Sequence, residues 1–318
     1  GRYRLIDFAL SSMRNAGILD VGVIMQRDYQ SLLDHIGSGK AWDMSRRNGG
    51  LRMLPPFGLP EYHTGNYTGT IEALNAVSTY IRDIPQKYLV LLLGNMCANI
   101  DLVPIMRQHS RSGVEITAIC ADHTPAQSHH RYVLPSLEGY IINKETLLKM
   151  MDECKARNLY SFHKHAVAAF LSKGGTMDTY VHPGYAVAIR TVEAYYKASM
   201  DMLKTEYRRQ LFPADRPVRT KVHEEVSTYY GETAVSRNSL VADNCKIEGS
   251  IENCIIFSGA RIEKGAKLRN CIIMRGGIVG ENTELDCVIA DKFCSFSPGT
   301  VLTGNARLPM VVPKGVSI

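Results

Sequence analysis

YLVLLLGNMCANID, residues 88–101, is a continuous apolar run that stops at Gly94 and Asn95. A run of this length, rich in Leu and Val and ended by Gly and Asn, predicts a strand buried on both faces of a parallel sheet. Open parallel sheets bind ligands at the carboxyl ends of their strands, so we expect a site in the loop at residues 95–101. Position 95 carries an amide, which neither ionises nor holds a divalent cation as a carboxylate does.

The segments around this run alternate between helix and strand patterns. Helical spacing of apolar residues predicts helices at residues 5–15, 69–81, 103–109, 144–157, 161–173 and 191–204. Strands are predicted from residue 20 and at residues 115–120, 137–143 and 177–188. Gly17 is the predicted C-terminal stop of the first helix. This alternation is typical of an α/β sheet.

Length and composition exclude several classes of protein. A chain of 318 residues suggests two domains, and 45% hydrophobic with 21% charged residues is typical of soluble proteins. No apolar run reaches membrane-spanning length, so we expect no membrane contact. The pattern of cysteines, described below, predicts a cytoplasmic protein. The net charge of +6 is spread along the chain, which argues against nucleic-acid binding. Because the sequence begins with Gly rather than Met, we expect a trimmed N-terminus.

Two glycine-containing words could bind an anion. Residues 37–40 read GSGK, but a phosphate-binding P-loop needs Gly and a hydroxyl where Asp34 and Ala41 stand, so that interpretation is rejected. Gly69 and Thr70 begin a predicted helix and could offer backbone N–H groups and a hydroxyl to an anion. A plain helix N-cap is the favoured interpretation of this pair.

Cationic and thiol side chains give further candidates. Arg2, Arg4 and Lys40 could bind a phosphate, and ordinary surface charge is the alternative. Three histidines in residues 121–135, at positions 123, 129 and 130, lack carboxylate support, so we expect surface histidines rather than a metal site. The eight Cys form no CxxC pair, which predicts reduced, packed thiols.

Beyond residue 233 apolar residues recur every six positions in triplets. The triplets are Val235, Val241, Ile247; Ile256, Ile262, Leu268; Ile273, Val279, Leu285; and Ile289, Ser295, Val301. A six-residue step places one short strand and one turn on each face, and three faces close one coil of a triangular parallel β-helix. A recurring word, such as the one beginning at Asn253, predicts a core ladder of cysteines, with regulated oxidation as the alternative. The ladder comprises Cys254, Cys271 and Cys287.

Six words of the sequence together resemble the ADP-glucose pyrophosphorylase (glucose-1-phosphate adenylyltransferase) family. They are GRYRLIDFALSSMRNAGI, SLLDHIGSGKAWD, YTGT, LLLGNMCANID, AYYKASMDML and RPVRTKVHEEVSTYYGE. Within that family the chain is most similar to the non-catalytic regulatory companion subunit of bacterial glycogen biosynthesis. The resemblance implies a Rossmann-like, GT-A-like nucleotidyltransferase domain at residues 1–205, a connector at 206–234, and a left-handed β-helix of hexapeptide repeats at 235–318.

The resemblance also implies which site residues to compare. The family joins ATP and glucose 1-phosphate to give ADP-glucose and pyrophosphate, and its catalytic members bind Mg²⁺ through two aspartates. Those positions align with Asn95 and Ala188, so both metal carboxylates are missing. We therefore expect no metal or cofactor in this chain, and Mg²⁺ in a catalytic partner. The expected remnant of the nucleotide and sugar-phosphate pocket is Gly69, Thr70, Gly94, Asn95, Asp101, Gly184 and Tyr185.

The expected function is a catalytically silent or nearly silent regulatory subunit in a hetero-oligomer, a tetramer, with a catalytic subunit. A sugar-phosphate or nucleotide effector would bind at Arg2, Arg4 and Lys40. One alternative is an active adenylyltransferase that takes metal ligands from elsewhere, such as Asp101 or Asp178. Another is a β-helix acyltransferase, which needs a His general base between coils, whereas no His follows position 223.

Overall fold

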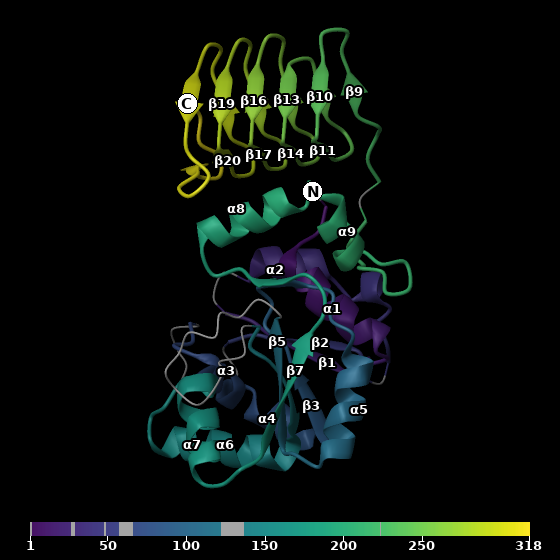
Figure 1. Cartoon of the computed structure of the whole chain (residues 1–318), viewed down its shortest axis with the longest axis vertical. Coiled ribbons are helices and arrows are strands. Elements are labelled where there is room, and N and C mark those ends of the chain that lie inside the picture. The colour runs from purple at the N-terminus through teal and green to yellow at the C-terminus, as the bar shows by residue number, and fades with distance from the viewer. Residues whose placement is uncertain (1, 27–28, 48, 57–65, 122–136, 223) are drawn as a thin grey trace. The chain divides into compact units, whose positions relative to one another are not determined.

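The computed structural model of the chain describes residues 2–26, 29–47, 49–56, 66–121, 137–222 and 224–318. Two compact units are present. The α/β unit comprises Leu5–Ala186 and Pro213–Lys221, and the β-helix unit comprises Gly1–Arg4, Val187–Phe212 and Val222–Ile318. The predicted fold class, an α/β domain followed by a parallel β-helix, is confirmed (Figure 1). The three histidines at positions 123, 129 and 130 lie outside the described residues.

The compact units divide the chain at other places than the predicted domain boundaries. Residues 187–205, which the sequence assigns to the first domain, belong to the same compact unit as the β-helix. Two helices of this stretch are α8 (Val192–Asp201) and α9 (Thr205–Leu211). The boundaries at residues 205 and 234 stay a prediction about the domains.

The α/β unit contains the alternating helices and strands that the sequence predicts. Its helices are α1 (Leu5–Asn15), α2 (Gln30–Ile36), η1 (Lys40–Trp42), α3 (Thr70–Ala76), α4 (Ser78–Asp83), α5 (Leu102–Ser112), α6 (Lys144–Ala156), η2 (Phe162–Val167) and α7 (Ala168–Ser172). Its strands are β1 (Val21–Ile24), β2 (Leu51–Leu54), β3 (Tyr88–Leu91), β4 (Met96–Ala98), β5 (Ile116–Ala121), β6 (Gly139–Asn143) and β7 (Met177–His182), and β8 (Ala186–Ala188) follows. Gly17 adopts φ +77°, as its predicted role after α1 requires.

The strand β3 differs from the prediction for residues 88–101. The order of the larger sheet is β3-β6-β5-β7, and β6 runs antiparallel to both β3 and β5, while β5 and β7 are parallel. All four residues of β3 are only half-buried. The expectation of a parallel strand buried on both faces is therefore wrong for β3, because an apolar run specifies neither the direction of its neighbour nor what covers each face.

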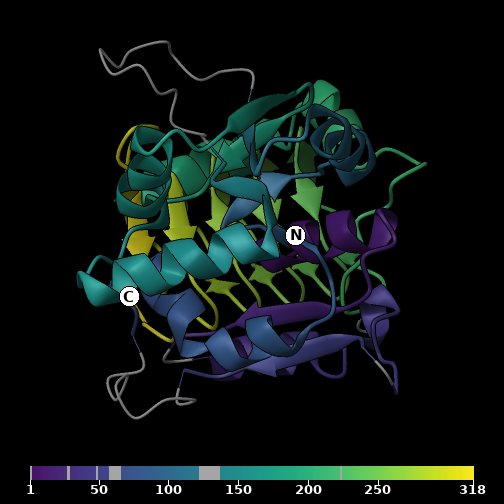
Figure 2. The same ribbon diagram turned by 90° about the horizontal axis from the view of Figure 1, so that it is seen from below.

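Two separate apolar layers cover the opposite faces of this sheet. Alternate residues of β5 and β6, among them Ile116 and Ile142, pack against α3, α4, α6 and η2. The residues between them, among them Ile119 and Ile141, pack against α5. Figure 2 shows helices on both sides of the strands. The strands buried on both faces are therefore β5 and β6.

The β-helix unit is built from three five-stranded parallel sheets, whose strands are stacked coil upon coil (Figure 1). The first sheet contains β10 (Val235–Arg237), β13 (Ser250–Glu252), β16 (Lys267–Arg269), β19 (Glu284–Asp286) and β22 (Val301–Thr303). The second contains β11 (Leu240–Val241), β14 (Ile255–Ile256), β17 (Ile272–Ile273), β20 (Val288–Ala290) and β23 (Met310–Val312). The third contains β9 (Tyr229–Tyr230), β12 (Lys246–Ile247), β15 (Arg261–Ile262), β18 (Ile278–Val279) and β21 (Ser295–Phe296).

The register of these sheets corrects the last predicted triplet, and Val235 of the first, by one residue. Ser236, not Val235, pairs with the buried Ile251. Ile256 pairs with Ile273 and Ile273 with Ala290, so these in-register partners are 17 residues apart. The inward positions of the last coil are Ala290 and Phe296, which are buried, whereas Val301 is 65% exposed. The prediction that Ile289, Ser295 and Val301 point inward is wrong, because it followed a shorter step between coils.

The predicted cysteine ladder holds for Cys254 and Cys271, which are buried in one core cluster, and is wrong for Cys287 for the same reason. In-register pairing places Val288, not Cys287, beside Cys271 and Cys254. Cys287 instead follows Asn253 and Asn270 at a corner where all three residues have a positive φ of 52–54°. Asn adopts this left-handed conformation more readily than most residues, so its recurrence at the corner is explained by the backbone. Cys287 takes the place of that Asn in the last coil.

A helix covers the outer face of the second sheet. Ile255, Ile272 and Ile289 face outward and pack against Tyr196 of α8. The Tyr196 hydroxyl donates a hydrogen bond of 2.8 Å to the carbonyl oxygen of Asn270. Figure 1 shows α8 lying along the stack of coils. The repeated Ile-Ile pairs thus supply one side chain to the inside of the coils and one to the contact with α8.

Within the described part of the chain, no helix has the length and apolar character needed to cross a membrane.

Candidate functional site

A cavity of about 520 Å³ lies in the α/β unit. Residues from α1, β1, the start of α3, the segment that follows β3, and the start of β6 line it. Of the predicted pocket residues, Gly69, Thr70 and Gly94 line this cavity. Its volume is within the range of small-molecule sites. The structure therefore brings together only part of the predicted remnant.

Asn95 directly follows the cavity-lining Gly94. Its Oδ1 atom is buried and has no hydrogen-bond partner among the described residues. A neutral amide oxygen contributes no charge to a metal site. Ala188, the other position expected at the metal site, is at the end of β8 in the β-helix unit. That the two positions face one site stays a prediction.

Asp101 is engaged in two structural contacts. One carboxylate oxygen accepts a hydrogen bond of 3.1 Å from the backbone N–H of Val103 and so caps α5. The other is paired with Arg216 at 3.0 Å. Asn99 donates from its amide to the carbonyl oxygen of Arg216 at 2.8 Å, which fixes the same segment. Asp101 therefore anchors residues 213–221 against the loop that follows β4.

Asp101 and Gly184 lie near His182 rather than at the cavity. Burial lowers the pKa of His182 to about 4, and the positive charge of Arg216 adds to this effect. The negative charge of Asp101 opposes it. A Cβ atom at Gly184 would lie 2.9 Å from the His182 ring nitrogen, so close packing explains the glycine. Tyr185 is buried in the core. His182 is thus a neutral, packed side chain at neutral pH.

Asp178, the other alternative metal ligand, is also engaged. It accepts hydrogen bonds of 2.7 Å from the Gln108 amide and of 2.7 Å from the backbone N–H of Thr179. Among the residues that the structure describes, no three His, Cys, Asp or Glu side chains form a group that could hold a metal ion. Mg²⁺ is held by carboxylates together with substrate phosphates. The amide of Asn95 and the engaged carboxylates of Asp101 and Asp178 do not fit that requirement.

The Gly69-Thr70 pair has a local structural role. Any Cβ at Gly69 would collide with the carbonyl oxygen of Tyr160, which accepts a hydrogen bond of 2.9 Å from Ile71. The backbone N–H of Thr68 donates to the Glu72 carboxylate at 2.6 Å. The Glu72 carboxylate thus fixes the residue that precedes the N-cap Gly69, and the carbonyl oxygen of Tyr160 satisfies the N–H of Ile71 in the first turn of α3.

The candidate effector residues are distributed over both units. Arg2 belongs to the β-helix unit, where it pairs with Asp243 at 3.0 Å. Arg4 belongs to the same unit, whereas Lys40 is an exposed residue at the start of η1 in the α/β unit. That these residues form one effector site stays a prediction.

Three cavity residues escaped the sequence analysis. Glu138 lines the cavity with φ +49°, and Tyr140 and His163 line it as a hydrogen-bonded pair, with 3.1 Å between the hydroxyl and the ring Nδ1. For Glu138 the only sequence signal is its place directly before Gly139, at the start of a predicted strand. A periodic pattern of apolar residues does not identify a cavity residue of this kind. His163 lies on η2, far from Tyr140 in sequence.

Most cysteines of the β-helix have surroundings that disfavour the thiolate; Cys254 differs, because its hydrogen bond with Cys271 lowers the pKa of its thiol. All eight Cys of the chain are buried and free of disulfides. Burial raises the pKa of the Cys271 thiol and, to a smaller extent, those of Cys287 and Cys294. A raised pKa lowers the fraction of thiolate, which is the form that oxidants attack. These surroundings favour packing over regulated oxidation.

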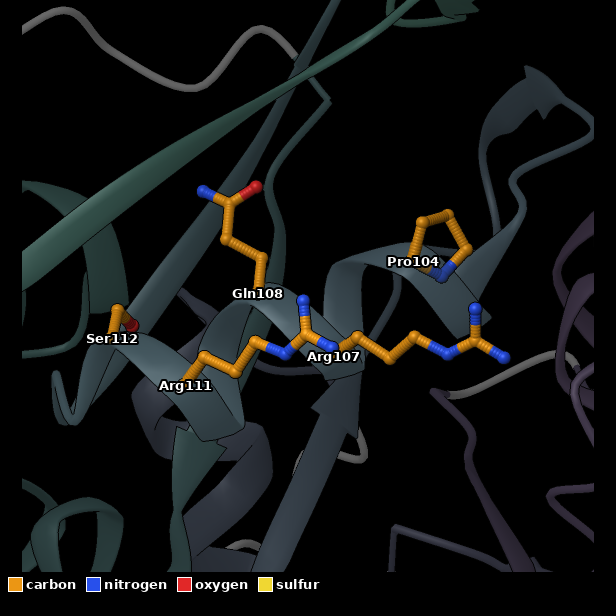
Figure 3. Close-up of a pocket in the computed structure, with 5 residues that line it drawn as sticks. All are labelled: Pro104, Arg107, Gln108, Arg111 and Ser112. Carbon is orange, nitrogen blue, oxygen red and sulfur yellow. The ribbon is translucent and has the colours of Figure 1, made fainter.

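A second hollow, of about 550 Å³, lies on the surface of α5 (Figure 3). Figure 3 shows Arg107 and Arg111 extending from the helix, with Gln108, Pro104 and Ser112 beside them. Gln108 is held by its hydrogen bond to Asp178. None of the predicted site residues lines this hollow.

Comparison with known proteins supports the two parts of the fold. A nucleotidyl transferase family model matches residues 1–135, and a model of the GlmU-like C-terminal hexapeptide region matches residues 222–308. The glycogen biosynthesis protein GlgD of Bacillus subtilis (strain 168) is 35% identical over 316 residues, which are 99% of this chain and 88% of that protein. GlgD of Geobacillus stearothermophilus is 36% identical over 315 residues, again 99% and 88%. A glucose-1-phosphate adenylyltransferase of Acetivibrio thermocellus is 29% identical over 318 residues, covering 92% of this chain and 74% of that enzyme.

Proposed function

This chain belongs to the family of the glycogen biosynthesis protein GlgD and the glucose-1-phosphate adenylyltransferases, and from that premise we propose that it is a regulatory subunit of such an adenylyltransferase. On its own it is catalytically silent or nearly so. It modulates a catalytic subunit that joins ATP and glucose 1-phosphate in glycogen biosynthesis. The two subunits form a hetero-oligomer, a tetramer, in the cytoplasm.

The observation that carries the proposal is the amide at Asn95, next to the cavity, where the metal-binding carboxylate is expected. Adenylyl transfer develops negative charge on phosphate oxygens, and a divalent cation is the usual means of neutralising it. The nearest acidic residue of the same loop, Asp101, is paired with Arg216 and caps α5. A side chain with both oxygens engaged would have to give up those contacts to bind a cation.

The two alternatives have less support. An active adenylyltransferase with atypical metal ligands needs Asp101 or Asp178, and both accept hydrogen bonds from the protein itself. A β-helix acyltransferase needs a general base, and residues 224–318 contain no His. Neither alternative explains why Asn95 stands beside the cavity.

A silent subunit can still regulate its partner. Binding of an effector shifts the balance between two states of an assembly whenever its affinity for those states differs. Arg2, Arg4 and Lys40, none of which lines the cavity, are the candidate contacts for a sugar-phosphate or nucleotide effector. The β-helix would supply part of the contact between subunits.

The test is steady-state synthesis of ADP-glucose by the purified chain, by its catalytic partner, and by the two mixed, with and without sugar phosphates. We expect no turnover by the chain alone, and a changed rate or effector response in the mixture. Turnover by the chain alone at a rate comparable to the partner would contradict the proposal.

A double variant, Asn95→Asp with Ala188→Asp, examines the reason for the silence. If the missing carboxylates are responsible, the double variant should gain Mg²⁺-dependent synthesis, while each single variant stays inactive because one carboxylate does not make the pair. Activity in the wild-type chain with no gain in the double variant would show that the metal is held elsewhere.

A further inference from the structure

We propose that one corner of the β-helix, between its second and third sheets, binds a nucleotide. Phe293 is the platform on which the base stacks, and Lys292 and Lys314 contact the phosphates. These residues lie within residues 224–318, all of which the structure describes. The site deepens the proposed function and rests on it in one respect, because a regulatory subunit needs a place for its effector.

Backbone hydrogen bonds align this corner from coil to coil. The N–H of Gly276 donates to the carbonyl oxygen of Ser258 at 3.1 Å, that of Phe293 to Arg275 at 2.9 Å, and that of Gly315 to Lys292 at 2.9 Å. The residue that donates and the residue before it therefore stack on their equivalents in the neighbouring coil. In the two earlier coils the donating residues are Asn244 and Gly259.

The backbone of Phe293 sets it apart from its equivalents. Its φ of +61° lies in the left-handed region, which bulky residues rarely adopt. The other coils carry residues suited to that conformation at the same position, namely Asn244, Gly259, Gly276 and Gly315. Phe293 is 56% exposed, so burial does not explain its ring. An aromatic residue held in a strained conformation at the surface indicates a functional role.

The ring of Phe293 is supported by the preceding coil. A Cβ atom at Gly276 would lie 2.7 Å from Cδ1 and 2.9 Å from Cε1 of Phe293, so one edge of the ring lies against this glycine. The contact is along an edge, and more than half of the residue is exposed, so a face of the ring is available to stack on a base.

A row of cations borders the ring. Arg275, Lys292 and Lys314 directly precede the left-handed residue in three successive coils. Like charges on neighbouring strands, about 4.8 Å apart, repel one another. Arg275 is paired with Glu225 at 3.5 Å. Within the described chain, the ammonium groups of Lys292 and Lys314 have no hydrogen-bond or ion-pair partner.

The acidic side chains at this corner have other contacts. Asp243 pairs with Arg2 at 3.0 Å, and Glu225 also accepts a hydrogen bond of 3.0 Å from the Ser258 hydroxyl. Asp291 accepts a hydrogen bond of 2.7 Å from the backbone N–H of Lys292. The Phe293 end of the corner therefore carries two ammonium groups against one carboxylate. Ammonium groups bind phosphate oxygens, and an adjacent aromatic ring suits a ligand that also carries a base.

The experiment is titration calorimetry of the full chain, at low ionic strength, with ATP, adenosine and inorganic tripolyphosphate. ATP has both a base and phosphates, whereas each of the other probes has only one of them. We expect ATP to bind at least about tenfold more tightly than adenosine or tripolyphosphate.

Phe293→Asn tests the aromatic platform. It introduces the residue that stands at the same corner in the first coil, so the melting temperature of the free chain should stay unchanged or rise. The affinity for ATP should fall about tenfold, because a stacking contact is lost. Val301→Asn, an exposed change on the first sheet, is the matched control and should leave the affinity for ATP unchanged.

The double variant Lys292→Gln with Lys314→Gln tests the phosphate contacts. It should weaken ATP binding about tenfold, remove most of its dependence on salt, and leave the affinity for adenosine unchanged. Lys264→Gln removes an exposed cation from the turn between β15 and β16, at another corner of the coils, and should change none of these quantities.

Several results would overturn the proposal. These are no binding of ATP, equal binding of ATP and tripolyphosphate, ATP binding that persists in both variants, and a lowered melting temperature in Phe293→Asn. If Phe293→Asn weakens association with the catalytic subunit and leaves ATP binding unchanged, the corner is a contact between subunits instead. The regulatory function is read from the rate of the catalytic partner. A chain that changes that rate without binding ATP at this corner would disprove the site alone.

Discussion

The two units of this chain bury their apolar side chains in different ways. In the β-helix, equivalent positions such as Ile256, Ile273 and Ala290 stack at intervals of 17 residues inside the coils. In the α/β unit, neighbouring residues of β5 and β6 belong to two layers, each completed by helices from distant parts of the chain. The core of the β-helix therefore repeats the same contacts from coil to coil, whereas each contact in the core of the α/β unit occurs once.

This difference determines how each unit tolerates change. In a stacked repeat a lost contact affects a coil and its neighbours, and the rest of the stack keeps its own contacts. In a sheet covered on both faces a buried group has no repeated equivalent. The second sheet of the β-helix combines both cases. The side chains on its inner face repeat their contacts from coil to coil, whereas those on its outer face pack against the single helix α8.

The largest expected effect concerns that outer side. Tyr196→Ala removes a ring that packs on Ile255, Ile272 and Ile289, so we expect a loss of about 3–5 kcal/mol in the free energy of unfolding, as for buried aromatics in other cores. Urea denaturation monitored by circular dichroism measures it. A loss comparable to that of an exposed substitution would mean that the repeat is stable without its helix.

Tyr196→Phe is the matched control for this change. It keeps the ring and removes only the hydrogen bond to the carbonyl oxygen of Asn270, so it should cost about 1 kcal/mol. A loss in Tyr196→Phe as large as that in Tyr196→Ala would assign the stabilisation to the hydroxyl instead of the ring.

The next effect is pH-dependent and belongs to the α/β unit. The pKa of His182 is lowered to about 4 in the folded chain, so the unfolded chain binds more protons as the pH falls below about 6.5. Stability is therefore lost as the pH drops from about 6.5 to about 4, by about 3 kcal/mol in total at this site. Unfolding free energies measured by urea titration at several pH values should show this slope.

His182→Gln isolates the contribution of this histidine. The variant cannot gain the proton, so its stability should fall less steeply over the same pH range than that of the wild-type chain. Parallel pH profiles for the two proteins would show that His182 remains uncharged in both states or charged in both.

The smallest effects compare two cysteines that look equivalent in the sequence. Cys254→Asn places an amide inside the coils, where it lacks partners, and should cost about 1–3 kcal/mol. Cys287→Asn restores the residue found at the two preceding corners and relieves the positive φ, so it should stabilise the chain by up to about 1 kcal/mol. Melting temperatures of the two variants measure both. Equal destabilisation would restore the single ladder that the repeated words suggest.

The sequence predicts much of the fold because the relevant signals are local. The helix at residues 5–15 is α1 (Leu5–Asn15), ended by Gly17, and the six-residue step identifies the three faces of the β-helix. The register of the last coil could not be read in this way. The repeated words suggest that Ile289 is the equivalent of Ile273. Strand pairing places Ala290, one residue later, in register with Ile273, and only this pairing decides which residue points inward.

The candidate site was less accessible to sequence analysis. Gly69, Thr70 and Gly94 follow recognisable strand and helix signals, and they do line the cavity. Asp101 belongs instead to a contact with Arg216, which lies more than a hundred residues away in the chain. Glu138 and His163 reach the cavity only through the tertiary fold. Pairings of this kind leave no spacing pattern in a single sequence.

The contact of α8 with three successive coils limits how the β-helix can change in length. The helix has ten residues, which is about 15 Å, and three stacked strands span about 10 Å. A duplication or deletion of 17 residues between Ile255 and Ile289 would displace one of the isoleucines by a whole strand spacing beneath Tyr196. The same genetic event outside that stretch leaves the contact intact. The number of coils can therefore change in evolution elsewhere in the stack, whereas the number of coils that contact α8 is constrained.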